Sequence, residues 1–347
     1  MSSMQPNTKR SSIPSRTGSQ SRTPRPARRL SVSIIGAGRL GTALGLALQT
    51  AGAKIEVVAT KRPSAARRAA KAFGPGTLSL SALQFSSMNP SQRERLNRSS
   101  LVLIATPDDS IAPIARMLAG IFNKEPASPR AARTTTAVRR VSLHTSGALA
   151  SDVLAPLRSA GFAVGSLHPL VSISESRPGA ELLTHAFFSL EGDPAAVRLG
   201  KSIVSDLGGE SFIIASQRKA LYHAAALTAA PNMTALFDIA LEMLGLCGLP
   251  PGRARQILLP LIKSTVSNLT TQDPARALTG TIQRGDVSTV RQHLAALKAA
   301  NLPQALAAYI VLGQRSVLLA KKRNPHPAGL DEITRLLRRA AKGSGGR

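Results

Sequence analysis

The most constraining feature of the sequence is a glycine-spaced turn between a short apolar run and an amphipathic segment. The apolar run covers residues 30–35, the spacing GxGxxG follows, and Leu and Ala then recur at helical intervals up to residue 52. A strand, a tight turn and a helix in this order are typical of the first βαβ unit of a dinucleotide-binding fold. The pattern therefore predicts a Rossmann-type domain.

Each glycine of this turn has a separate expected role. Gly36 makes the turn out of the strand, Gly38 lets a pyrophosphate approach bare backbone, and Gly41 lets the helix pack on the strand. The N-terminus of the helix would add unpaired backbone N–H groups. We therefore expect Arg39 and Leu40, which lie between the glycines, to join them in the cofactor site.

The end of the next predicted strand, residues 55–60, indicates which dinucleotide binds. An NAD site needs a carboxylate here for the ribose 2′-hydroxyl, whereas an NADP site needs cations for the 2′-phosphate. Thr60, Lys61 and Arg62 occupy this position. Glu56 is the competing candidate for the ribose, but the strand pattern continues past it. The sequence thus favours NADP, as NADPH, over NAD.

Strand and helix signals alternate through the first half of the chain and then stop. Further strand-type runs cover residues 101–105, 141–144, 162–167 and 187–191, which predicts a doubly wound parallel sheet. From residue 216, helical periodicity runs through residues 216–246, 253–270, 287–299 and 304–321. We expect an α/β Rossmann domain over 30–215, followed by an all-α domain over 216–322.

The chain has a net charge of +27, and both of its ends are rich in arginine. Residues 1–29 contain arginines among Ser, Thr and Pro, which predicts a disordered basic tail, and residues 323–347 are expected to form a second basic tail. Such arms can contact phosphates or serve in targeting. The basic stretches lack interleaved aromatic residues for base stacking, which disfavours nucleic acid as the main partner.

A single cysteine and the absence of metal-binding spacings argue against a disulfide-stabilised fold and against a metal site. Cys247 cannot form an intramolecular disulfide, and its apolar surroundings predict a buried, inert thiol. No paired-histidine metal motif occurs, so no metal site is expected. Pro231, Asp238 and Glu242 interrupt the most apolar stretch, and we therefore expect no membrane span and a soluble, cytoplasmic protein.

Polar residues follow the later strands, at the edge where open α/β sheets bind ligands. Thr106 and Pro107 follow residues 101–105 and should flank the nicotinamide. Ser146 and His168 follow the next two strands and are expected on the same rim, facing the substrate.

Lys219 and His223 are four residues apart at the start of the first long helix of the second half, which places them on one helical face. A carbonyl reduced by hydride needs a proton donor, and a partly desolvated lysine or a histidine can supply the proton. A solvated lysine and a core histidine remain the alternative interpretation. Together with Ser146 and His168, these residues form the expected catalytic set.

Four motifs in a fixed order resemble those of an uncharacterised family of predicted bacterial oxidoreductases. They are SLHTSG at 142–147, GSLHPL at 165–170, KALYHAA at 219–225 and LTGTIQRGD at 278–286. Members pair an N-terminal Rossmann-like domain with a C-terminal domain of unknown function, similar to the helical domain of 6-phosphogluconate dehydrogenase. The resemblance covers residues 30–322.

This resemblance implies a superfamily that includes ketopantoate reductase, pyrroline-5-carboxylate reductase and β-hydroxyacid dehydrogenases, which place the active site between two domains and dimerise through the helical one. Lys219 looks like the lysine that assists carbonyl reduction in ketopantoate reductases and β-hydroxyacid dehydrogenases. His223 stands where these relatives usually carry Asn, and Thr281 where the family usually has Pro.

Residues and resemblance together predict an NADP-dependent oxidoreductase that reduces a small keto acid, such as ketopantoate or a β-hydroxyacid precursor, in a cleft between two domains of a homodimer. The alternative is a non-catalytic dinucleotide sensor whose basic arms bind nucleic acid or a protein partner.

Overall fold

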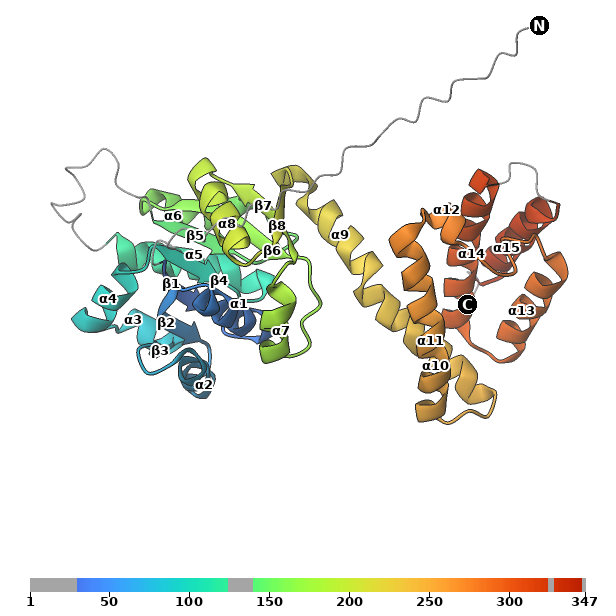
Figure 1. Cartoon of the computed structure of the whole chain (residues 1–347), viewed down its shortest axis with the longest axis horizontal. Helices are drawn as coiled ribbons and strands as arrows, with labels where there is room; N and C mark the ends of the chain where they lie inside the picture. The colour runs from blue at the N-terminus through green and yellow to red at the C-terminus, as the bar shows by residue number, and fades with distance from the viewer. Residues whose placement is uncertain (1–29, 124–139, 324–327, 345–347) are drawn as a thin grey trace, which may run out of the picture. The chain divides into compact units, whose positions relative to one another are not determined.

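The computed structural model describes residues 30–123, 140–323 and 328–344 (Figure 1). The chain divides into two compact units, Met1–Tyr222 and His223–Arg347. The expected boundary between 215 and 216 thus falls within the first unit. The basic tail expected over residues 1–29 lies outside the described residues.

The first unit is built on an eight-stranded sheet in the order β3-β2-β1-β4-β5-β6-β7-β8. All neighbouring strands are parallel except β6 and β7, which are antiparallel. The strands are β1 (Ser31–Ile35), β2 (Lys54–Thr60), β3 (Leu78–Ser81), β4 (Leu101–Ile104), β5 (Val141–His144), β6 (Ala163–Pro169), β7 (Phe187–Gly192) and β8 (Glu210–Ile213).

Helices cover both faces of this sheet and enclose two separate apolar cores (Figure 1). Neighbouring residues of one strand point to opposite faces, so that Ile34 lies in one core and Ile35 in the other. The helices are α1 (Arg39–Thr50), α2 (Pro63–Phe73), α3 (Ala82–Ser86), α4 (Pro90–Asn97), α5 (Asp108–Phe122), the 3₁₀ turn η1 (Ser151–Leu154), α6 (Ala155–Ser159), α7 (Ser176–Leu183) and α8 (Pro194–Asp206).

This architecture confirms the expected doubly wound sheet and the strands that the sequence predicts. The sequence does not predict β3 and β8, because each has only four residues and neither is a continuous apolar run. The antiparallel pairing of β6 with β7 departs from the expected parallel sheet. The strand β8 follows β7 through α8 and extends the sheet by one more strand.

The described part of the second unit contains only helices, as expected. The 3₁₀ turn η2 (Ser216–Arg218) and the first turn of α9 belong to the first unit, and the remaining helices to the second. Four of the helices begin at a proline, whose missing N–H has no partner to lose at a helix start. The helices are α9 (Lys219–Ala229), α10 (Pro231–Leu246), α11 (Pro251–Thr271), α12 (Pro274–Ala277), α13 (Val287–Ala299), α14 (Pro303–Arg323) and α15 (Leu330–Ser344).

The expectation of a basic tail over residues 323–347 is wrong for most of that segment. Residues 330–344 form α15, which packs against α13 and α14 (Figure 1). Leu330, Ile333 and Leu337 are fully buried in the core of the second unit. Their spacing of three and four residues is a helical apolar stripe, which is hard to recognise among the neighbouring charged residues.

One further expectation about the second unit needs correction. Cys247 is exposed at the end of α10 and is not a buried thiol. The segment Ser216–Leu246 has the length and composition of a possible membrane span, and the most apolar window within it is not buried. Many apolar side chains of α9, α10 and α11 are therefore exposed in the single chain.

Candidate active site

The glycine turn after β1 packs the start of α1 closely against the end of the strand. Gly36 has a φ of +98°, and its N–H donates a 2.8 Å hydrogen bond to the carbonyl oxygen of Ala59. A Cβ added to Gly41 would lie 1.9 Å from the carbonyl oxygen of Gly36. These two glycines are therefore required by the fold itself.

Gly38 differs from its neighbours because a Cβ built on it would meet nothing within 4 Å. It is the N-cap of α1, where it offers no side chain to the first N–H groups, and the first turn of α1 carries no acidic residue. The backbone here is thus open to a ligand, and the helix end favours an anion.

The first helix begins where the strand order changes direction. Strands β2 and β4 flank β1 on its two sides, so the loops after β1 and β4 diverge at this point. Ligands of doubly wound sheets bind in the crevice at such a switch point. Thr106 lies in the loop after β4, and its buried hydroxyl oxygen has no hydrogen-bond partner among the described residues. Pro107 follows as the N-cap of α5.

The residues after β2 provide positive charge at the same edge of the sheet. Lys61 and Arg62 are exposed, and neither forms an ion pair with another described residue. The Thr60 hydroxyl donates to the Arg62 carbonyl oxygen at 2.7 Å, which fixes this turn. The first turn of α2 contains no acidic residue that would neutralise the cations.

Glu56, the competing ribose candidate, is engaged elsewhere. Its side chain is buried and forms ion pairs with Lys54 at 2.7 Å and Arg95 at 3.5 Å. The β1–β2 register shifts at this residue, and four more residues of β2 follow it before the strand ends. Glu56 is thus held away from the carboxyl end of the strand.

Lys219 is the only charged side chain among the largest fully buried ones of the described chain, with 1% of its surface exposed. Its Nζ donates to the Ser166 Oγ at 2.6 Å and to the Ser146 carbonyl oxygen at 3.2 Å. Burial lowers the pKa of Lys219 to about 8, while the negative charges of Glu191 and Asp108 counteract part of this shift. Near neutral pH the amine is close to the point where it can release a proton.

Ser146 is the centre of a hydrogen-bonded loop after β5. Its hydroxyl donates to Asp108 Oδ2 at 2.9 Å and accepts the N–H groups of Ala148 at 3.2 Å and Leu149 at 3.0 Å. Glu191 holds the other end of the loop by accepting both the N–H and the hydroxyl of Ser151. Two carboxylates therefore fix the loop that Lys219 contacts.

Two histidines lie on the neighbouring strands β5 and β6. Burial, and secondly the charge of Lys219, lower the pKa of His144 to about 3, so this imidazole is neutral. Its Nδ1 accepts the N–H of Ser146 at 3.2 Å. His168 is half-buried, and its Nδ1 lies 2.8 Å from the Tyr222 hydroxyl oxygen. Burial raises the pKa of Tyr222.

The structure brings two of the four expected catalytic residues into direct contact, Ser146 and Lys219. His168 lies two residues after Ser166 on β6, and it is linked through Tyr222 to the same turn of α9 that carries Lys219. His223, half-buried, lies one turn after Lys219 on α9 and begins the second unit.

Ser166, Glu191 and Tyr222 also contact the site, although the sequence patterns do not predict a role for them. Asp108 follows the N-cap Pro107 in the first turn of α5, and its carboxylate accepts a hydrogen bond from the Ser146 hydroxyl. Ser166 could have been predicted as a site residue, because it pairs with His144 across the parallel strands β5 and β6. Glu191 could not have been predicted, since only the antiparallel placement of β7 brings it to this loop.

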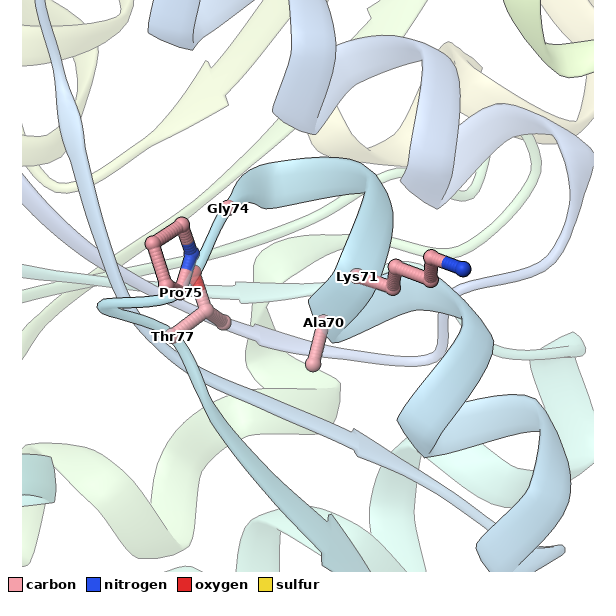
Figure 2. A pocket seen from close by; sticks show the side chains of 5 residues that line it. All are labelled: Ala70, Lys71, Gly74, Pro75 and Thr77. Carbon is pink, nitrogen blue, oxygen red and sulfur yellow. The ribbon is translucent and has the colours of Figure 1, made fainter.

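A hollow of about 340 Å³ lies elsewhere in the first unit, between the end of α2 and the start of β3. Figure 2 shows its lining residues, with the Lys71 side chain directed away from Pro75 and Thr77. Because it lies where a strand begins, it is at the opposite edge of the sheet from the glycine turn. It therefore plays no part in the candidate site.

Two family models match successive parts of the chain. A Rossmann-like domain matches residues 16–169, and the Domain of unknown function DUF2520 matches residues 186–316. The chain belongs to the family that joins these two domains. No curated protein matches the sequence.

Solved structures share the fold at low sequence identity. The protein TM1727 from Thermotoga maritima has a TM-score of 0.61 and 22% identity, over 84% of this chain and 99% of that one. The protein BF3122 from Bacteroides fragilis, described as a candidate NADP oxidoreductase, has a TM-score of 0.62 and 22% identity, over 83% and 97%. A reductive aminase from Aspergillus terreus, in complex with NADPH and ethyl levulinate, has a TM-score of 0.51 and 16% identity, over 90% and 94%.

The lowered pKa of Lys219 predicts a pH-dependent contribution to stability. Below pH 8 the native state contains the buried ammonium, whereas between about pH 8 and 10.5 it loses a proton that the unfolded chain retains. The free energy of unfolding of the wild type should therefore rise with pH across this window relative to Lys219→Met. Urea unfolding of both proteins at several pH values measures this, and a constant difference would contradict the lowered pKa.

Proposed function

We propose that the protein is an NADP-dependent oxidoreductase that reduces a small keto acid of the ketopantoate or β-hydroxyacid type. The observation that carries the proposal is the buried Lys219, which is held over the loop after β5 in the same sheet that carries the glycine turn. A buried amine with a pKa near 8 suits general acid catalysis at physiological pH.

The residues at the glycine turn fit a dinucleotide. Gly38 leaves open space for a diphosphate, and the backbone of Gly36, Arg39, Leu40 and Gly41 surrounds the acid-free start of α1. We assign the 2′-phosphate to Thr60, Lys61 and Arg62, and the nicotinamide side to Thr106 and Pro107. The bound nicotinamide would supply the hydride. The NADP named for the Bacteroides protein and the NADPH named for the Aspergillus enzyme support this cofactor class.

On the substrate side, Lys219 is the proposed proton donor to the carbonyl oxygen. Two of its three N–H bonds are directed to Ser166 and Ser146, which leaves the third for a substrate. The neutral His144 cannot bind a carboxylate as a cation, whereas His168, with its Tyr222 partner, could orient the substrate through hydrogen bonds. His223, one turn further along α9, remains a second proposed donor.

The cofactor assignment predicts a preference for NADPH that depends on Arg62. Replacing Arg62 by Gln should raise the Kd for NADPH by about tenfold and leave the Kd for NADH nearly unchanged, because only NADPH carries the phosphate that the guanidinium would bind. Fluorescence titration measures both constants. Arg62 is the N-cap of α2, and Lys71→Gln, which removes an exposed charge from the last turn of that helix, is the matched control. A wild type that prefers NADH would overturn the assignment.

The catalytic assignment predicts that Lys219→Met retains the cofactor but loses turnover. We expect kcat to fall by about 10² to 10⁴, the usual contribution of a general acid, while the Kd for NADPH stays within about twofold. Steady-state reduction of a panel of small 2-keto and 3-keto acids measures this. Lys201→Met, on the exposed side of α8, is the control. Wild-type protein that binds NADPH yet reduces none of the panel would favour the dinucleotide sensor.

We further propose that the protein is a cytoplasmic homodimer whose contact involves α10 and α11. Both helices expose large apolar side chains, and neither contributes a fully buried large residue to the core of the second unit. Exposed apolar side chains in such number are typical of an obligate interface. The exposed apolar residues include Met233, Leu236, Leu246, Ile257, Leu259, Leu261, Val266 and Leu269.

The dimer proposal predicts that charge on this surface separates the subunits. Leu261 and Leu269 are 62% and 50% exposed and lie about two turns apart on α11. Their joint replacement by Glu should leave helix content unchanged and halve the mass measured by sedimentation equilibrium. A monomeric wild type would contradict the proposal.

A further inference from the structure

A hollow of about 350 Å³ in the second unit is lined by three arginines, a glutamate and a leucine. Arg291 comes from α13, whereas Glu332, Arg335, Leu336 and Arg339 come from α15. It lies outside the candidate active site, and α15 begins after the DUF2520 match ends at residue 316. Neither the family match nor the proposed reductase function gives this hollow a role.

The positive charges of the hollow are only partly balanced. Glu332 forms an ion pair with Arg291, whose Nη2 lies 2.8 Å from Oε1. Among the described residues, no carboxylate forms an ion pair with Arg335 or Arg339. Three guanidinium groups and one carboxylate leave two positive charges.

The spacing of the two unpaired arginines makes this arrangement unfavourable without a ligand. Arg335 and Arg339 are four residues apart on one helix, where like charges destabilise the helix. Rotation of the helix about its axis cannot separate these charges from the hollow, because Leu330, Ile333 and Leu337 bury its opposite face in the core. The fold therefore holds two guanidinium groups side by side over a concave surface.

We propose that this hollow binds the phosphate group of a small phosphorylated molecule. A phosphate monoester carries about −1.5 to −2 charges at neutral pH, which matches the two unbalanced positive charges. Planar guanidinium groups bind phosphate oxygens in pairs, and the pairing with Glu332 holds Arg291 in place beside them. The volume is at the lower end of the range for small-molecule sites.

The test compares two variants of the full chain with the same loss of charge. The first is the double variant Arg335→Gln and Arg339→Gln, which removes both unpaired cations that line the hollow. Arg338→Gln with Lys342→Gln removes two exposed cations from other positions of α15. Both variants retain Lys61 and Arg62, so phosphate binding at the proposed cofactor site is common to both and cancels in the comparison.

Isothermal titration with inorganic phosphate at low ionic strength should give saturable binding to the wild type. We expect the Kd at the hollow to rise by at least about tenfold in the Arg335/Arg339 variant and by less than about twofold in the Arg338/Lys342 variant. Equal losses in both variants would show a non-specific charge effect and overturn the proposal. The proposal would also fail if a short RNA bound tightly while phosphate showed no saturable binding. Unchanged melting temperatures verify that both variants fold.

Discussion

The close approach of Gly41 to the Gly36 carbonyl oxygen determines where the first helix lies against the first strand, and the candidate cofactor site depends on this contact. No side chain fits between the start of α1 and the end of β1, because a Cβ there would overlap the backbone. The helix therefore starts directly over the strand end, with its N–H groups at the switch point between β1 and β4. A site for an anion follows from this packing constraint, since the helix end, the open face of Gly38 and the unpaired Thr106 hydroxyl share one edge.

A second constraint is the buried charge of Lys219. An ammonium group away from water is costly unless polar groups surround it, and here Ser166 and the Ser146 carbonyl oxygen provide the direct contacts. Asp108 and Glu191 act at longer range and also fix the loop that presents Ser146. The same carboxylates thus stabilise the loop and moderate the pKa of the amine. Such a balance between burial and nearby charge is how proteins place a lysine near its titration point at neutral pH.

The sequence predicts the features that depend on local patterns and misses those that depend on distant pairing. The glycine turn, the long buried strands and the lysine on α9 each have a signature within a few residues. Asp108 and Glu191 reach Ser146 and Ser151 from 38 and 40 residues away in the sequence, so only the folded sheet order brings them there. In the C-terminal segment the error has a different cause. Its charge count predicts a tail, whereas the interval between Leu330, Ile333 and Leu337 predicts a helix, and core packing decides between them.

The excess positive charge of the chain separates into groups with different physical roles. Lys219 is buried and near its titration point, so its proton can move. Lys61 and Arg62 are exposed cationic side chains at the end of a strand, where they can bind an anion. Arg335 and Arg339 lie on a helix whose opposite face is buried, and no carboxylate of the described residues forms an ion pair with them, which makes their mutual repulsion part of the folded state. Net charge alone would treat these residues alike, but burial and local pairing give each group a distinct chemistry.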